Sequence, residues 1–140
     1  PRQMRDFRIR QDHARGEPVS VDLKARKRDY GKDDLALETW SVIEAQKLGW
    51  TRDPAKNSDY VIWYWPSTGR FVLLPFPPLC FVFGRLWQEW SATYKTRRQI
   101  THGSRETWHS EMVLVPRAEV LRAIVRWTGC KDILEGIVNA

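Results

Sequence analysis

The feature that most constrains this fold is a short run of strictly alternating apolar and polar residues. The run covers positions 19–24 and consists of Val19, Ser20, Val21, Asp22, Leu23 and Lys24. Successive side chains of a strand point to opposite faces, so the alternation predicts a half-buried β-strand. Asp22 and Lys24 are two residues apart, and we therefore expect their side chains on one face.

A second alternating run, at positions 6–10, lies just upstream and begins with Asp6. The polar residues between the two runs include Gly16 and Pro18, which is typical of a hairpin loop. Pairing of the two strands would bring Asp6 close to Asp22 and Lys24. Two carboxylates can hold a hard cation such as Mg²⁺ through oxygen, and a nearby lysine can orient a water molecule or offset phosphate charge.

This arrangement resembles the PD-(D/E)XK nuclease superfamily, in which an acidic residue precedes a hairpin and an acidic-x-Lys triplet. The matching residues are Asp6 and the triplet at positions 22–24. The resemblance implies a restriction-endonuclease-like fold and a Mg²⁺- or Mn²⁺-dependent endonuclease that hydrolyses phosphodiester bonds, in DNA rather than RNA, with a phage or mobile element as the source. It also implies that Asp6, Asp22 and the Leu23 carbonyl bind the metal, and that Lys24 serves the attacking water.

One departure from the family pattern concerns the helix that usually precedes the hairpin and often carries a glutamate facing the metal. Only five residues precede Asp6. We expect that such a helix lies upstream in a longer chain, that another carboxylate substitutes for its glutamate, or that the metal site is incomplete. The last case favours an alternative function, a catalytically inactive relative that binds nucleic acid or protein.

The distribution of charge favours a polyanionic partner for the N-terminal segment. The net charge is +6, and residues 1–32 hold ten Lys or Arg against five Asp or Glu, whereas the remainder is almost balanced. A basic surface around a carboxylate site attracts nucleic acid. The residues predicted to contact nucleic acid are Arg8, Arg10, Arg26, Lys27, Arg28, Arg97 and Arg98.

Further along the chain, hydrophobic periodicity and turn residues predict an α+β fold with one mixed sheet of five or six strands flanked by helices. Later strands are expected at 35–42, 58–65, 70–76 and 111–115. A short helix or turn is expected at 44–49, a helix from Pro77 to about Arg98, a loop at 100–110, and helices at 117–127 and 131–138. The predicted core includes Trp63, Phe71, Leu73, Phe83 and Trp90.

Two further residues could reach a site formed at the strand ends. Glu38 is a carboxylate in the middle of a predicted strand, where burial without a partner is costly. It is either an additional acidic group of the site or a residue on a solvent-exposed face of the strand. Gln46 follows that strand in the sequence.

Length and composition predict a single nuclease-like domain over residues 1–140. No apolar run is long enough for a membrane span, since prolines interrupt the longest one. The two cysteines, Cys80 and Cys130, lack metal-ligand spacing and are expected to be buried free thiols, with a disulfide as the alternative. These features predict an intracellular, cytoplasmic protein.

Overall fold

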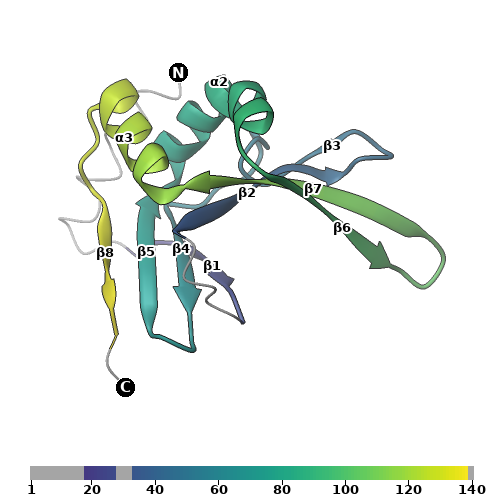
Figure 1. Ribbon diagram of the computed structural model, residues 1–140, viewed down its shortest axis with the longest axis horizontal. Coiled ribbons are helices and arrows are strands. Elements are labelled where there is room, and N and C mark those ends of the chain that lie inside the picture. Colours follow the sequence, from purple (N-terminus) through teal and green to yellow (C-terminus); the bar gives the residue numbers. More distant parts are fainter. Residues whose placement is uncertain (1–17, 28–32, 139–140) are drawn as a thin grey trace.

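The strands of the described chain form two separate four-stranded sheets. The computed structural model describes residues 18–27 and 33–138. The first sheet has the order β1-β4-β5-β8, with bounds Val21–Ala25, Tyr60–Trp65, Arg70–Pro75 and Leu134–Ile137. The second has the order β3-β2-β7-β6, with bounds Lys47–Leu48, Asp34–Val42, Thr107–Pro116 and Thr96–His102. Figure 1 shows the two sheets diverging from a shared helical layer.

The first sheet is mixed because β1 pairs parallel to β4, whereas β4–β5 and β5–β8 are antiparallel. The β4–β5 hairpin turns at residues 66–69, and Gly69 adopts a φ of 71° that suits glycine. All pairings of the second sheet are antiparallel.

Two helices cover the region where the sheets meet. Helix α2 (Phe76–Thr93) has the Pro77-Pro78 pair in its first turn, where their missing amide hydrogens cost nothing. Helix α3 (Arg117–Thr128) ends at Gly129, which adopts the left-handed conformation with a φ of 66°. Helix α2 contacts β4, β5 and β7, and α3 contacts α2, β2 and β7. None of the described helices combines the length and apolarity needed to cross a membrane.

The core lies between the helices and the inner faces of β2, β4 and β5. Alternate residues of these strands are buried, which is the pattern of a sheet covered on one face. The largest fully buried side chains are Trp63, Trp65, Phe83, Leu35, Leu37, Leu74, Leu79, Ile124, Val61, Val72, Val82 and Val113.

The α+β class is confirmed, but the prediction of one mixed sheet of five or six strands was wrong. Residues 34–42 and 107–116 pair with each other rather than with β4 or β5, so a second sheet forms. Among the predicted core residues, Trp63, Phe83 and Trp90 are buried. Phe71 and Leu73 are only half-buried because they lie on the outer face of β5, opposite the buried Val72 and Leu74.

Three other local predictions were wrong. The helix expected to continue to about Arg98 ends at Thr93, and Arg97 and Arg98 lie in β6. Residues 100–110 are the ends and turn of the β6–β7 hairpin rather than a loop. Residues 134–137 form β8 rather than a helix, because they pair along the open edge of β5. Cys80 and Cys130 are half-buried and do not form a disulfide.

Candidate nucleic-acid interface

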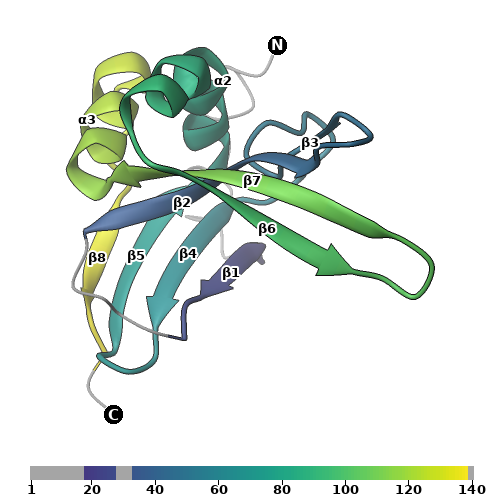
Figure 2. The ribbon, with the colours of Figure 1, turned by 45° about the vertical axis from the view of Figure 1, so that its right-hand side comes forward.

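A groove with a volume of about 660 Å³ lies between the two sheets. One wall is β1, the edge strand of the first sheet, and the other is the face of β2, β7 and β6 (Figure 2). Its lining residues are Leu23, Lys24, Ala25, Arg26, Lys27, Ala36, Glu38, Trp50, Trp63, Arg97, Gln99 and Met112.

The orientation of β1 follows from its parallel register with β4. Asp22 is paired with Val61 and Lys24 with Trp63, so both charged residues share the inner face with buried neighbours. Leu23 lies on the outer face, where its side chain is 59% exposed. The prediction that Asp22 and Lys24 share one face is confirmed, and that face is the inner one.

The Ser20–Asp59 pair anchors β1 at its start. The Asp59 carboxylate accepts the Ser20 backbone N–H at 2.8 Å, and the Ser20 hydroxyl accepts the Asp59 backbone N–H at 3.0 Å. Tyr60 donates its backbone N–H to the Ser20 carbonyl at 3.0 Å. These bonds connect the loop before β4 to the residue before β1, and they set the register between the two strands.

Asp22 lies between two lysines. Its Oδ2 atom is 2.8 Å from Lys56 Nζ and 3.0 Å from Lys24 Nζ. This oxygen is buried, and neither lysine contact has the alignment of a hydrogen bond. Burial alone would raise the pKa of Asp22, but the two lysines outweigh it and hold the pKa below its ordinary value. Lys56 and Lys24 therefore hold Asp22 in its ionised form.

Glu38 is a second carboxylate in the same charged cluster. It is half-buried on β2, and its Oε1 atom accepts the Trp50 backbone N–H at 3.3 Å. Burial raises the pKa of Glu38 above its ordinary value, although the Trp50 N–H and the nearby charges of Lys24 and Lys56 act to lower it. Because the two lysines that contact Asp22 also act on Glu38, the two carboxylates belong to one electrostatic unit.

An aromatic layer backs this cluster. Lys24 Nζ lies 4.5 Å from the centroid of the Trp50 ring, which is within cation–π distance. The Trp50 ring in turn packs against Trp63 and Phe76, each with a centroid separation of 6.0 Å. The position of the Lys24 ammonium is thus restricted by a packed aromatic surface as well as by Asp22.

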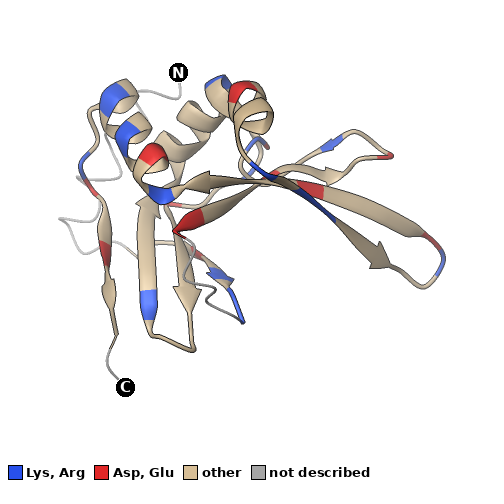
Figure 3. Cartoon of the chain, viewed as in Figure 1, with Lys and Arg blue, Asp and Glu red and all other residues tan. Residues whose placement is uncertain are grey.

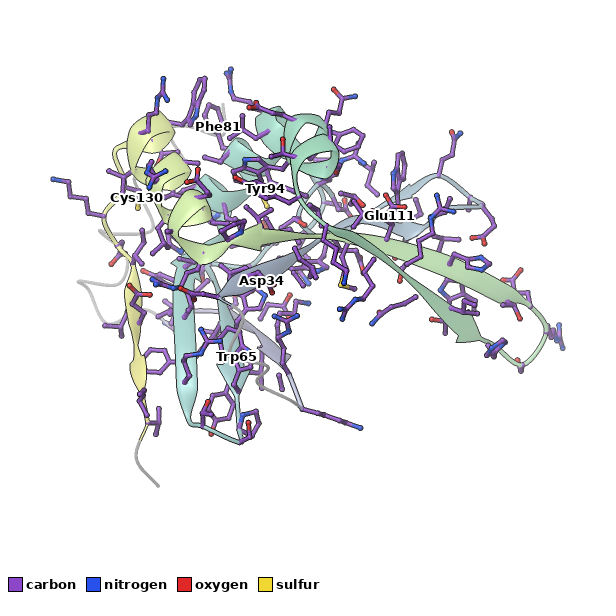
Figure 4. All side chains as sticks on the ribbon, viewed as in Figure 1. Asp34, Trp65, Phe81, Tyr94, Glu111 and Cys130 are labelled. Carbon is purple, nitrogen blue, oxygen red and sulfur yellow. The ribbon has the colours of Figure 1, made fainter. Side chains whose placement is uncertain are left out.

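Four basic residues line the groove, namely Lys24, Arg26, Lys27 and Arg97; Figure 3 marks the Lys and Arg positions of the chain in blue. Arg26 binds Asp34 at 3.2 Å and lies 5.9 Å from the Trp65 ring; Asp34 and Trp65 are labelled in Figure 4. Lys27 and Arg97 have no ion-pair partner within residues 18–27 and 33–138. The groove therefore offers unneutralised positive charge beside a carboxylate–lysine cluster.

The other residues predicted for the site are distributed as follows. Arg98 lies on β6 but binds Glu111 at 2.9 Å, on the face of the β6–β7 pair that is directed away from the groove. Gln46 is exposed in the turn between β2 and β3, with a φ of 50°, and does not line the groove. Asp6, Arg8, Arg10 and Arg28 are outside the described residues.

Sequence reasoning missed two members of the cluster, Lys56 and Trp50. Both lie in the segment between β3 and β4, where no periodic pattern marks a side chain as facing inward. A tryptophan in a loop was the only sequence signal, since a ring of that size is rarely left in solvent. Nothing in the sequence identifies Lys56 as the second partner of Asp22.

Asp22 and Glu38 fit a magnesium site in donor chemistry. Mg²⁺ is commonly bound through one or two carboxylates together with substrate phosphates and water. Asp22 Oδ2 is a buried oxygen that the Lys24 and Lys56 ammonium groups already contact, so a cation would bind it only if one of the two lysines moved away. No set of three or more His, Cys, Asp or Glu residues with metal-binding geometry occurs in the described part of the chain, so the remaining ligands would be phosphate and water.

Comparisons with protein-family models, with curated proteins and with solved structures each found no match.

Proposed function

We propose that the protein is a metal-dependent nuclease that binds nucleic acid in the groove between its sheets. The observation that carries this proposal is the placement of Lys24 and Glu38 in one basic groove lined by Trp50 and Trp63, with Asp22 in contact with Lys24. Phosphates are attracted by unpaired basic groups at the groove rim, and hydrolysis needs oxygen ligands and a positioned cation beside the scissile phosphate.

Each residue of the cluster has a distinct part in this proposal. Lys27 and Arg97 bind the phosphate backbone, because both line the groove and neither is neutralised by a described carboxylate. Asp22 and Glu38 would hold Mg²⁺ or Mn²⁺, which supplies charge stabilisation and an activated water when bound. Lys24, restrained by Asp22 and the Trp50 ring, orients the attacking water and offsets developing charge on the phosphate.

The test is cleavage of plasmid DNA and of short DNA and RNA substrates with Mg²⁺ or Mn²⁺. Lys24→Ala should reduce cleavage at least 100-fold, in line with the usual contribution of a positioned proton-transfer or charge-stabilising group, while most binding remains. Asp22→Ala should also abolish cleavage. Lys131→Ala is the matched control, because Lys131 is exposed and lies outside the groove.

A non-catalytic nucleic-acid-binding protein is the second candidate. It is favoured by the two lysines on Asp22, which already satisfy the charge that a metal would balance. In that case the wild type binds nucleic acid in a salt-dependent manner and cleaves nothing with either metal, and Lys24→Ala has little effect. Cleavage by the wild type that Lys24→Ala removes would exclude this candidate.

A further inference from the structure

The groove continues onto a projecting two-stranded ribbon formed by β6 and the outer half of β7. Cross-strand pairs place Arg97 opposite Met112, Gln99 opposite Ser110, and Thr101 opposite Trp108. Directly opposed residues of an antiparallel pair share a face. Because Arg97, Gln99 and Met112 line the groove, Thr101 and Trp108 extend the same face outward beyond it. We call this surface, defined by Arg97, Gln99, Thr101 and Trp108, the ribbon face.

Charged side chains on the opposite face of the ribbon pair with other residues of the protein. Arg98 binds Glu111, which is labelled in Figure 4 near the root of the ribbon, and His109 contacts Glu44 through its ring. Arg97, on the ribbon face, has no ion-pair partner within the described residues. Unbalanced positive charge therefore occurs on the face that continues the groove.

The ribbon is anchored at its root but open along its length. All seven residues of β6 are exposed, and the ribbon extends away from the rest of the protein in both views (Figures 1 and 2). The support extends past the middle of the ribbon, where His109 pairs with Ile100: Ile43 donates its backbone N–H to the His109 carbonyl at 2.8 Å, and Glu44 accepts the His109 backbone N–H at 3.0 Å. In β7, Trp108 and His109 are half-buried and Ser110 is buried, so β6 is the strand of the ribbon that is available to a partner without rearrangement of the core.

We propose that the ribbon face enters the major groove of duplex DNA whose backbone lies in the groove between the sheets. This inference rests on the proposed function and adds the class of substrate. The major groove of B-form DNA admits a two-stranded β-ribbon, whereas the deep, narrow major groove of A-form RNA does not. The span from Thr96 to His102 is about 20 Å, which matches roughly six base pairs.

The side chains of the ribbon face suit base edges and backbone. Gln99 has the amide pair that can bind adenine through two hydrogen bonds, and the Thr101 methyl can contact a thymine methyl group. Arg97 lies at the inner end of the ribbon face, where it can bind guanine or a phosphate. Because Gln99 and Thr101 carry no charge, they should contribute to the preference for duplex DNA and to sequence specificity rather than to the salt-dependent part of the affinity.

The test compares two double variants of the same strand. Gln99→Ala/Thr101→Ala removes the ribbon face, and Ile100→Ala/His102→Ala is the matched control on the opposite face. Binding is measured by fluorescence anisotropy at fixed salt with a 20-base-pair DNA duplex, an RNA duplex of the same sequence, and one DNA strand alone. We expect the wild type to prefer duplex DNA to duplex RNA at least tenfold. The ribbon-face variant should lose about tenfold on duplex DNA only, and the control less than twofold.

Three results would overturn the inference. Equal loss of affinity for duplex and single-stranded DNA would make the ribbon face a single-strand contact. Equal loss of affinity in both variants would show that the two faces of the ribbon do not differ in binding. No loss of affinity would remove the ribbon from the interface. The proposed function is tested separately by Lys24→Ala cleavage. If the wild type cleaves while the ribbon-face variant binds and cleaves normally, the inference fails and the proposed function stands. If the wild type binds no nucleic acid, both fail.

Discussion

The packing of Gly49 against Glu38 gives a prediction whose magnitude follows directly from the coordinates. A Cβ atom at position 49 would lie 2.1 Å from the Glu38 carbonyl oxygen and 2.9 Å from its Cγ. Favourable carbon contacts are about 3.5–4.0 Å apart, so β2 would have to move by roughly 1 Å or more. Gly49 also donates its N–H to the Thr39 carbonyl at 3.1 Å, which opposes such a shift.

Gly49→Ala should therefore destabilise the protein strongly. Overpacking usually costs about 1–3 kcal/mol, and the atoms in conflict here are mainly backbone atoms that cannot turn aside, so we expect a loss near 3 kcal/mol. The matched control is Gly84→Ala. Gly84 is exposed in α2, an added Cβ meets nothing within 4 Å, and replacing a helical glycine by alanine should stabilise by about 0.5–1 kcal/mol.

Urea unfolding followed by tryptophan fluorescence measures both free energies. The two variants should shift the midpoint in opposite directions with little change in the slope m. If Gly49→Ala unfolds within about 0.5 kcal/mol of the wild type, the usual range of an unconstrained surface substitution, the close packing of Gly49 on Glu38 is refuted. A destabilised Gly49→Ala protein that still folds should also show a changed Glu38 environment, and hence weaker cleavage.

Three other perturbations have expected outcomes. Trp90→Ala should cost about 3–5 kcal/mol in the same unfolding assay because the ring is buried, and a stable variant would contradict its place in the core. Burial and the 2.7 Å hydrogen bond to Asp132 raise the pKa of Tyr60, so the free energy of unfolding should fall as pH rises above the ordinary tyrosine pKa of about 10. Tyr60→Phe should flatten this alkaline loss of stability. An unchanged alkaline profile in the variant would contradict the raised pKa of Tyr60. Lys27→Ala/Arg97→Ala should reduce the slope of log binding constant against log salt by roughly 1.8, the value for two lost phosphate contacts, whereas an unchanged slope would remove both residues from the interface.

The sequence predicted those elements whose pattern arises from burial on one side. The β4–β5 hairpin followed from runs rich in aromatic and β-branched residues on either side of a Pro-Ser-Thr-Gly turn, and its buried residues include Trp63 and Val72. Helix α3 followed from its apolar spacing and from Gly129. Helix α3 has one face against the core and the other in solvent, so the spacing of its apolar residues indicates a helix.

The β6–β7 ribbon and β8 escaped prediction for the converse reason. Every residue of β6 is exposed, so no apolar period marks it as a strand. The four residues of β8 acquire strand geometry by pairing with β5, a long-range partner that a local pattern cannot reveal. The division into two sheets is likewise a consequence of which strands pair, and pairing between residues as distant as Leu35 and Val115 has no local signature.

For the site, the sequence indicated which residues share a face but not which way that face is directed. In isolation, the alternation at positions 19–24 favours burying the valines and Leu23, and the structure directs Asp22 and Lys24 inward instead. A shift of one residue in a strand register would exchange the two faces completely. The reciprocal bonds between Ser20 and Asp59 oppose that shift, because they fix the residue immediately before β1 to the residue immediately before β4. The charged cluster thus depends on a short polar contact outside the groove. The cost of turning two charged residues inward is offset by the contacts of Asp22 with Lys24 and Lys56, and by the groove that Lys24 lines.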